Sequence, residues 1–248
     1  QITQIATILI CAICAICGFV DPGIAEKACQ ENKLLGYCVS PPAVNLYSVG
    51  EIIKGSSILL GAQNCYFETK GAFTGETSPE MLVSVGCKYV IIGHSERRNI
   101  FKETNTMIQK KVAAAVRVGL IPIICIGETL EERQANKTLT VISKQLRSAT
   151  DFLFEDGITN IVIAYEPVWA IGTGLSATPE QAEEIHSFIR DTCAMDFGDT
   201  TRQVPLLYGG SVNESNAGVL LKQPNIDGFL VGGASLKSDS FLSICNAA

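Results

Sequence analysis

The sequence predicts an α/β protein, a single-domain (β/α)8 barrel over residues 1–248. Eight short apolar runs recur along the chain, and amphipathic stretches lie between them. Each run is nearly continuous in hydrophobicity, which is typical of parallel strands covered on both faces. Eight β/α units fit a chain of 248 residues as a closed barrel, with a doubly wound sheet as the alternative.

The first strand is predicted in the apolar run that ends at Val20, which we expect to continue into a helix. This run lacks the Lys- and Arg-rich start of a signal peptide. Its apolar part begins at Ile8 and is too short to span a bilayer comfortably, so we expect no membrane partner. The other strands are predicted at residues 37–40, 57–62, 88–92, 121–126, 160–165, 204–208 and 227–231.

Helical spacing appears between these runs. Ile108, Val112 and Val116 fall on one face of a predicted helix, and we place Lys110 and Lys111 on the opposite face.

A later helix is predicted to begin at residue 178. Thr178 is suited to the N-cap, Pro179 to the first helical position and Gln181 to the third. His186 lies on this helix, and we expect it at the surface.

Composition excludes several classes of protein. The chain is 47% hydrophobic with a net charge of -6, and no basic cluster is longer than two residues, so nucleic acid is not an expected partner. Most of the ten cysteines stand alone, several of them inside apolar runs, where Cys behaves as a small buried hydrophobe. This pattern indicates a reducing, cytoplasmic compartment without a disulfide framework.

Cys11, Cys14 and Cys17 are the exception, because they are spaced C-x2-C-x2-C. An iron–sulfur run would need a fourth Cys followed by Pro, and the chain continues instead with Val20-Asp21-Pro22. We therefore expect no metal.

Glu166 directly follows the predicted strand 160–165 and precedes Pro167 and a glycine-containing loop. A carboxylate at the end of a buried strand, before a loop that can close, fits a general base under a lid. Taken alone, the pattern fits a surface Glu at a turn equally well.

His94 follows the strand 88–92, and a helix is predicted directly after it. The positive end of that helix dipole lowers the pKa of the imidazole and favours its neutral form, which can donate a hydrogen bond to a carbonyl oxygen. A structural His within a Ser, Glu and Arg cluster is the alternative.

Paired glycines follow the last two strands, at 209–210 and 232–233. Backbone N–H groups exposed by glycine form anion sites, and barrels commonly bind phosphate at these two loops. A G-x-G-x-x-A pattern at residues 172–177 predicts no nucleotide cofactor. It begins seven residues after Tyr165, whereas a dinucleotide fingerprint turns directly off its strand.

Seven motifs between about residues 38 and 237 resemble the triosephosphate isomerase family, whose fold is the (β/α)8, or TIM, barrel. Two of them, around His94 and Glu166, are nearly diagnostic of the family. The motifs are AQNCY (62–66), KGAFTGE (70–76), IIGHSERR (91–98), CIGETLEER (125–133), AYEPVWAIGTG (164–174), YGGSV (208–212) and NIDGFLVGGASLK (225–237).

The resemblance implies an enzyme of glycolysis and gluconeogenesis that interconverts dihydroxyacetone phosphate and D-glyceraldehyde 3-phosphate without metal or cofactor. It implies that Glu166 moves a proton between adjacent carbons and that His94 stabilises the enediolate. A lid over residues 167–177 would close on the substrate. The remaining implied residues are Gly172, Ser211, Gly232 and Gly233 for phosphate binding, and Glu96, Cys125 and Tyr208 as supporting groups.

The resemblance also implies a homodimer. A loop over about residues 65–80 would insert into the partner subunit, with Thr74 reaching across and Phe73 as an anchor at its tip.

One family motif is missing. The first strand of the family ends in Asn-x-Lys, and the expected positions here hold Ile10 and Ala12, which supply neither a hydrogen-bond donor nor a charge. A charged hydrogen bond contributes roughly 1.5–3 kcal/mol, so the printed sequence predicts activity lowered by about two orders of magnitude or more. Two interpretations follow: a catalytically impaired barrel that acts as a phosphate-binding or interaction protein, or a misassigned segment 1–36, for example after a frameshift.

We favour the misassigned segment, because an apolar, motif-free stretch precedes a sharp family match. Intact mass and N-terminal peptide sequencing test this prediction, and we expect peptides that differ from ICAICAICGFV (10–20). Peptides with this exact sequence would contradict it.

Overall fold

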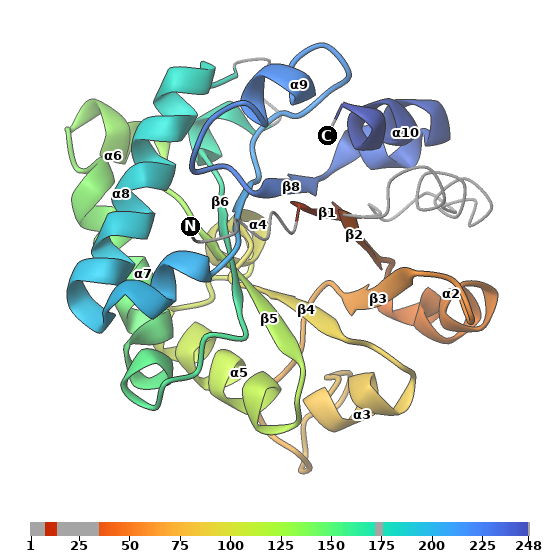
Figure 1. The fold of residues 1–248 in the computed structure, drawn as a ribbon. Helices are drawn as coiled ribbons and strands as arrows, with labels where there is room; N and C mark the ends of the chain where they lie inside the picture. The colour runs from red at the N-terminus through yellow and green to blue at the C-terminus, as the bar shows by residue number, and fades with distance from the viewer. Residues whose placement is uncertain (1–7, 14–34, 172–175, 248) are drawn as a thin grey trace.

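The computed structural model describes residues 8–13, 35–171 and 176–247. Eight parallel strands form a closed barrel in chain order, and helices surround it (Figure 1). This topology confirms the predicted (β/α)8 class and excludes the doubly wound sheet. The strands are β1 (Ile8–Ile13), β2 (Leu35–Ser40), β3 (Ile58–Ala62), β4 (Tyr89–Ile92), β5 (Ile121–Ile126), β6 (Val162–Tyr165), β7 (Leu206–Tyr208) and β8 (Gly228–Val231).

The described helices connect successive strands, except α10, which follows β8. Among them, none is long and apolar enough to cross a membrane. The α-helices are α2 (Leu46–Ile52), α3 (Pro79–Ser84), α4 (Ser95–Asn99), α5 (Asn105–Arg117), α6 (Leu130–Gln134), α7 (Thr138–Glu155), α8 (Pro179–Phe197), α9 (Ala217–Leu220) and α10 (Ser238–Asn246). Short 3-10 turns are η1 (Ala43–Asn45), η2 (Val168–Ala170), η3 (Asp199–Gln203) and η4 (Gly233–Leu236).

Helix α8 begins as the sequence predicts. The Thr178 hydroxyl accepts the Gln181 N–H, and the Gln181 side chain in turn accepts the Thr178 N–H. This reciprocal capping satisfies two backbone donors that the first helical turn leaves without partners.

Strand β1 closes the barrel, because it pairs with β2 on one side and β8 on the other. The N-terminal apolar run thus supplies the first strand, and Ile10 and Ala12 lie on it. The helix expected after this strand lies outside the described residues, as do Cys14 and Cys17 of the cysteine run.

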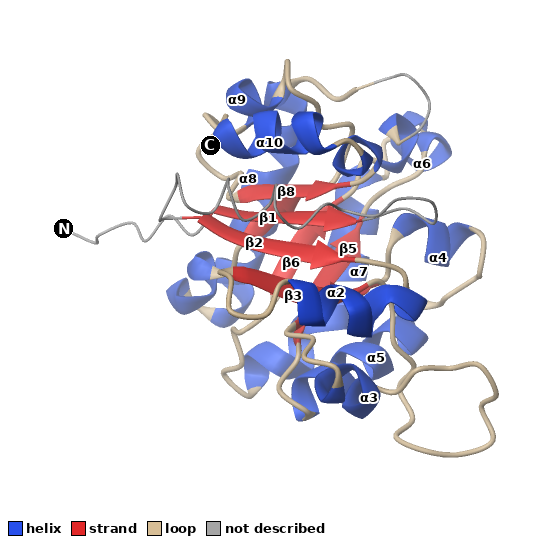
Figure 2. Ribbon diagram, turned by 90° about the vertical axis from the view of Figure 1, so that its right-hand side faces the viewer, coloured by secondary structure: helices blue, strands red, loops and turns tan. Residues whose placement is uncertain are grey.

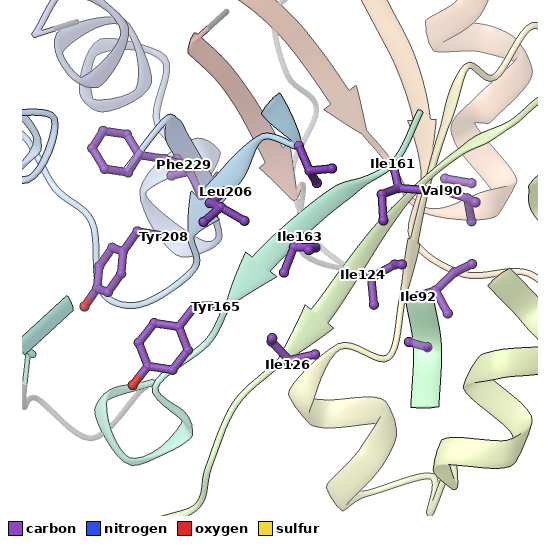
Figure 3. Close-up of a cluster of buried hydrophobic side chains, with 14 of the residues drawn as sticks. Val90, Ile92, Ile124, Ile126, Ile161, Ile163, Tyr165, Leu206, Tyr208 and Phe229 are labelled. Carbon is purple, nitrogen blue, oxygen red and sulfur yellow. The ribbon is translucent and has the colours of Figure 1, made fainter. Parts of the chain in front are cut away.

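The core has two layers, which follow from the alternation of side chains along each strand. One cluster consists of strand residues that fill the barrel, such as Ile91, Ile123 and Leu230. The other lies between the barrel and the helices and includes Tyr165 and Tyr208 (Figure 3). These two tyrosines are register partners on β6 and β7, and their side chains point to the same side.

All the strands run in one direction, so their carboxyl ends meet at the same end of the barrel (Figure 2). Helix α4 begins at that end. His94 and Glu166, which follow β4 and β6, are therefore brought to one rim.

The structure corrects the placement of Lys111. Its side chain is 2% exposed, and its Nζ donates to Glu103 Oε1 (2.6 Å) and Asn64 Oδ1 (2.8 Å). Lys111 follows Ile108 by three positions and so shares the apolar face of α5. The buried charge persists there because Glu103 supplies a countercharge.

His186 is also buried, not at the surface as expected. It lies on the apolar face of α8 with Ile185 and Ile189. Its Nδ1 is 3.2 Å from the carbonyl oxygen of Asn225, and its Nε2 has no hydrogen-bond partner among the described residues. Burial lowers its pKa to about 3.

The depressed pKa of His186 predicts an acid-dependent loss of stability. Below about pH 6.5 His186 binds a proton in the unfolded chain, whereas in the folded chain it stays neutral down to about pH 3. The free energy of unfolding therefore decreases as the pH is lowered through this window. Between pH 7 and pH 5 the loss from this residue is about 2 kcal/mol. Urea unfolding of His186→Gln should show a pH dependence weaker by that amount, and an unchanged pH dependence would contradict the prediction.

Candidate active site

Glu166 lies at the carboxyl end of β6 and is 2% exposed. Its backbone N–H donates to the Ile126 carbonyl oxygen (2.8 Å), so pairing with the β5 chain continues one residue past β6. A carboxylate at this depth requires hydrogen-bond partners, because burial without them costs several kcal/mol.

Two groups from the β4–α4 segment supply those partners. The backbone N–H of Ser95 donates to Glu166 Oε2 (2.9 Å), and His94 Nε2 lies 2.9 Å from Glu166 Oε1. His94 Nδ1 accepts the N–H of Glu96 (3.4 Å), so Nδ1 carries no proton and the imidazole proton on Nε2 faces Glu166. The predicted base and the predicted electrophile are therefore in direct contact.

The pKa of His94 differs from the sequence prediction. Burial acts to lower it, but the charge and hydrogen bond of the Glu166 carboxylate outweigh burial and raise the pKa above its ordinary value. The predicted lowering is thus wrong for this arrangement, because a full negative charge at 2.9 Å exceeds the dipole of a five-residue helix.

Two glycines pack against Glu166 at positions where a larger residue would clash with it. A Cβ at Gly209 would lie 2.9 Å from Glu166 Cγ, and a Cβ at Gly127 would lie 1.8 Å from the Glu166 carbonyl oxygen. The N–H of Gly209 already donates to the Tyr165 carbonyl oxygen (2.8 Å). Gly209 is therefore a close-packing residue beneath the base and not the anion donor that we expected.

Gly232 and Gly233 fit the predicted anion site better. Both are exposed, they lie at the start of η4, and a Cβ at either would meet nothing within 4 Å. Ser235 fixes this turn, since its hydroxyl donates to the Gly232 carbonyl oxygen (2.7 Å). The Ser211 hydroxyl donates to the Ala170 carbonyl oxygen (2.8 Å) and thereby joins the β7 loop to η2.

Glu128 is a site residue that the sequence analysis did not single out. It is fully buried, it accepts hydrogen bonds from Tyr165 Oη (3.2 Å) and Trp169 Nε1 (2.9 Å), and it pairs with Arg133 Nη1 (3.1 Å). The Arg133 guanidinium also lies 4.4 Å from the centroid of the Trp169 ring. This Glu128 cluster anchors the first residues of the expected lid. Its position in the CIGETLEER motif was the available clue.

The other expected residues differ in their burial and in their contacts. Glu96 is exposed, with Oε2 3.9 Å from His94 Nδ1. Cys125 is fully buried, and its carbonyl oxygen accepts Arg98 Nη2 (2.9 Å). Burial raises the pKa of Tyr208 to about 12; its hydroxyl lies near the Ala177 backbone without a hydrogen bond of normal geometry. Gly172 lies outside the described residues.

The β3–α3 loop follows the carboxyl end of β3, so it begins at the same end of the barrel as Glu166. Phe73 is 41% exposed, its ring centroid lies 4.8 Å from that of Tyr66, and Thr74 beside it is exposed. The loop therefore presents an aromatic side chain to solvent within this chain.

Among the described residues, no group of three or more His, Cys, Asp and Glu side chains could hold a metal ion. The site's polar groups are a carboxylate, an imidazole and backbone amides, which are suited to proton transfer next to a carbonyl and to binding an anion.

Comparisons with known proteins agree with this chemistry. The family model described as triosephosphate isomerase matches residues 22–248. A triosephosphate isomerase of Rhodopirellula baltica is 52% identical over 209 residues, which are 84% of this chain and 82% of that protein. One of Pseudomonas fluorescens is 52% identical over 211 residues, 85% of this chain and 84% of that protein. The crystal structure of a Bartonella henselae triosephosphate isomerase superposes with a TM-score of 0.86 at 41% identity, covering 96% of this chain and 98% of that one.

Proposed function

The chain belongs to the triosephosphate isomerase family, and from that premise we propose how its residues interconvert dihydroxyacetone phosphate and D-glyceraldehyde 3-phosphate. The observation that carries the proposal is the buried Glu166 carboxylate, held by His94 Nε2 and the Ser95 N–H at the rim of the barrel. The relatives are named for the active enzyme, and none of these comparisons favours an impaired barrel.

Glu166 is the proposed base. Its carboxylate turns from Ser95 and His94 toward the substrate and removes a proton from the carbon beside the carbonyl. The electron pair of the broken C–H bond forms an enediolate, and Glu166 returns the proton to the adjacent carbon. Aldose and ketose are thereby interconverted with no net gain or loss of atoms.

His94 is the proposed electrophile, because its Nε2 proton can donate to the substrate oxygen on which negative charge develops. When Glu166 leaves Nε2, the main influence that raises the His94 pKa is removed, and the lowering effect of burial then outweighs the remaining charge of Glu96. The imidazole is then favoured in its neutral form during proton transfer. A Glu base with a neutral His is the pairing already described for triosephosphate isomerases.

The substrate phosphate is proposed to lie against the N–H groups of Gly232 and Gly233, with Ser211 beside them. Both glycines face open space at the start of η4, and the first N–H groups of a helical turn have no acceptor within the turn and can bind an anion. Gly172 would complete the site when the lid over residues 167–177 closes. Closure excludes water, which protects the enediolate from losing phosphate.

Replacing Glu166 with Asp tests the assignment of the base. Asp is one methylene shorter, and a displacement of about 1 Å can cost on the order of a hundredfold in rate. In a coupled assay with glyceraldehyde 3-phosphate we expect kcat to fall by about that factor while KM changes little. Exposed Glu131→Asp is the matched control and should keep full turnover. Unchanged turnover in Glu166→Asp would refute the assignment.

We also propose that the chain acts as a cytoplasmic homodimer. The β3–α3 loop exposes Phe73, and further large apolar side chains are exposed on neighbouring segments. Burying such a set against a second copy is favoured by the hydrophobic effect. The set comprises Val44, Tyr47, Ile52, Met81, Val83, Ile100 and Phe101.

The dimer proposal predicts the effect of a charge at the loop tip. Phe73→Asp should shift the chain from dimer to monomer in sedimentation velocity, because an ionised carboxylate would be buried without a partner. Leu139→Asp introduces the same charge at an exposed Leu on α7 and should leave the dimer intact. A Phe73→Asp variant that remains fully dimeric would exclude the loop tip as an anchor.

A further inference from the structure

Gly127 follows the last residue of β5 and is buried, so its backbone groups need partners. The side chain of Gln145, on the neighbouring helix α7, supplies both of them. The Gly127 N–H donates to Gln145 Oε1 (2.9 Å), and Gln145 Nε2 donates to the Gly127 carbonyl oxygen (3.1 Å). The Gln145 amide thus satisfies both backbone groups of Gly127, which a neighbouring strand would otherwise pair with.

Gly127 is in direct contact with the backbone of Glu166. A Cβ at position 127 would lie 1.8 Å from the Glu166 carbonyl oxygen and 2.8 Å from its carbonyl carbon. The two chains therefore pack without space between them, and a displacement of Gly127 toward Glu166 must move Glu166 as well.

The residues on either side of Gly127 hold the same segment. The carbonyl oxygen of Ile126 accepts the Glu166 N–H (2.8 Å), and that of Glu128 accepts the Val168 N–H (3.2 Å). The Glu128 side chain binds Trp169 Nε1 (2.9 Å). Residues 126–128 are thus a platform for both Glu166 and η2.

We propose that Gln145 is a positioning residue for Glu166. It fixes Gly127 from the α7 side, and the platform of residues 126–128 carries that constraint to the Glu166 backbone. Both hydrogen bonds of the Gln145 side chain go to Gly127, so Gln145 is proposed to act on Glu166 through Gly127. The proposal rests on the isomerase activity proposed above, since that activity is its readout.

A purely structural role for Gln145 makes a different prediction. If the amide only satisfies two buried backbone groups, its loss lowers the thermal midpoint and leaves the kcat of the folded enzyme unchanged. If the amide positions Glu166, kcat falls in fully folded enzyme as well, because proton transfer depends on the placement of the base.

The experiment compares Gln145→Met with the unaltered enzyme, well below both thermal midpoints. Met preserves side-chain length and removes both hydrogen bonds. We expect kcat to fall roughly ten- to a hundredfold, with KM within about threefold. Inhibition by inorganic phosphate should be unchanged, because the backbone and side-chain groups proposed to bind phosphate lie in the loops after β7 and β8. Emission from Trp169, the single Trp of the chain, should shift as the platform relaxes.

Two further variants keep the test decisive. Gln145→Glu retains an acceptor for the Gly127 N–H, so its kcat should lie between those of the unaltered enzyme and Gln145→Met. This variant provides a readout if Gln145→Met does not fold. Arg147→Met, on the same helix as Gln145, breaks the ion pair between Arg147 and Asp196 of α8 and should leave kcat unchanged.

The outcomes separate the two proposals. A folded Gln145→Met enzyme with full kcat overturns the positioning role, and so does a Gln145→Glu enzyme with full kcat. An unaltered enzyme without isomerase activity overturns the proposed function itself.

Discussion

The buried carboxylate of Glu166 is the constraint around which this end of the barrel is built. A negative charge at the end of β6 is tolerated only with donors at hydrogen-bond distance, and the Ser95 N–H, 71 residues earlier, and the adjacent His94 provide them. Closure of the barrel is what brings β4 and β6 to one rim. Positions 209 and 127 must then be glycine, because a Cβ at either position would occupy space that Glu166 fills.

Three buried glutamates have different partners, and the difference matches the role proposed for Glu166. Glu103 is paired with Lys111 and Arg97, and Glu128 with Arg133. Among the described residues, Glu166 is within ion-pair distance of no Lys or Arg, and its partners are an imidazole and an amide. A Lys or Arg would keep its charge and hold the carboxylate in place, whereas an imidazole and a backbone amide bind it less permanently, as the proposed movement toward substrate requires. The surroundings of Glu166 are therefore consistent with the proposed role of a mobile base.

Much of this arrangement could be predicted from the sequence because it depends on local patterns. The strands followed from continuous apolar runs, and Glu166 and His94 from their positions directly after strands. Lys111 and His186 were misplaced because their residue types outweighed their spacing, although both fall on apolar helical faces. The predicted direction of the His94 pKa shift was wrong because the shift depends on a contact with Glu166, which is 72 residues away in the sequence. Gln145 was not predicted for the same reason. Its role depends on hydrogen bonds to Gly127, which lies close to it only in the folded chain.

The closure of β1 against β8 has a consequence for biosynthesis. Residues 9–12 pair with residues 228–231, so the last seam of the sheet joins segments from opposite ends of the chain. On the ribosome β1 must wait for its second partner until β8, more than 200 residues later, has been translated. During that interval the growing sheet presents an open, apolar edge, which is the kind of surface that recruits other nascent chains. The same seam that completes the rim makes translation speed and chaperone supply part of this protein's folding problem.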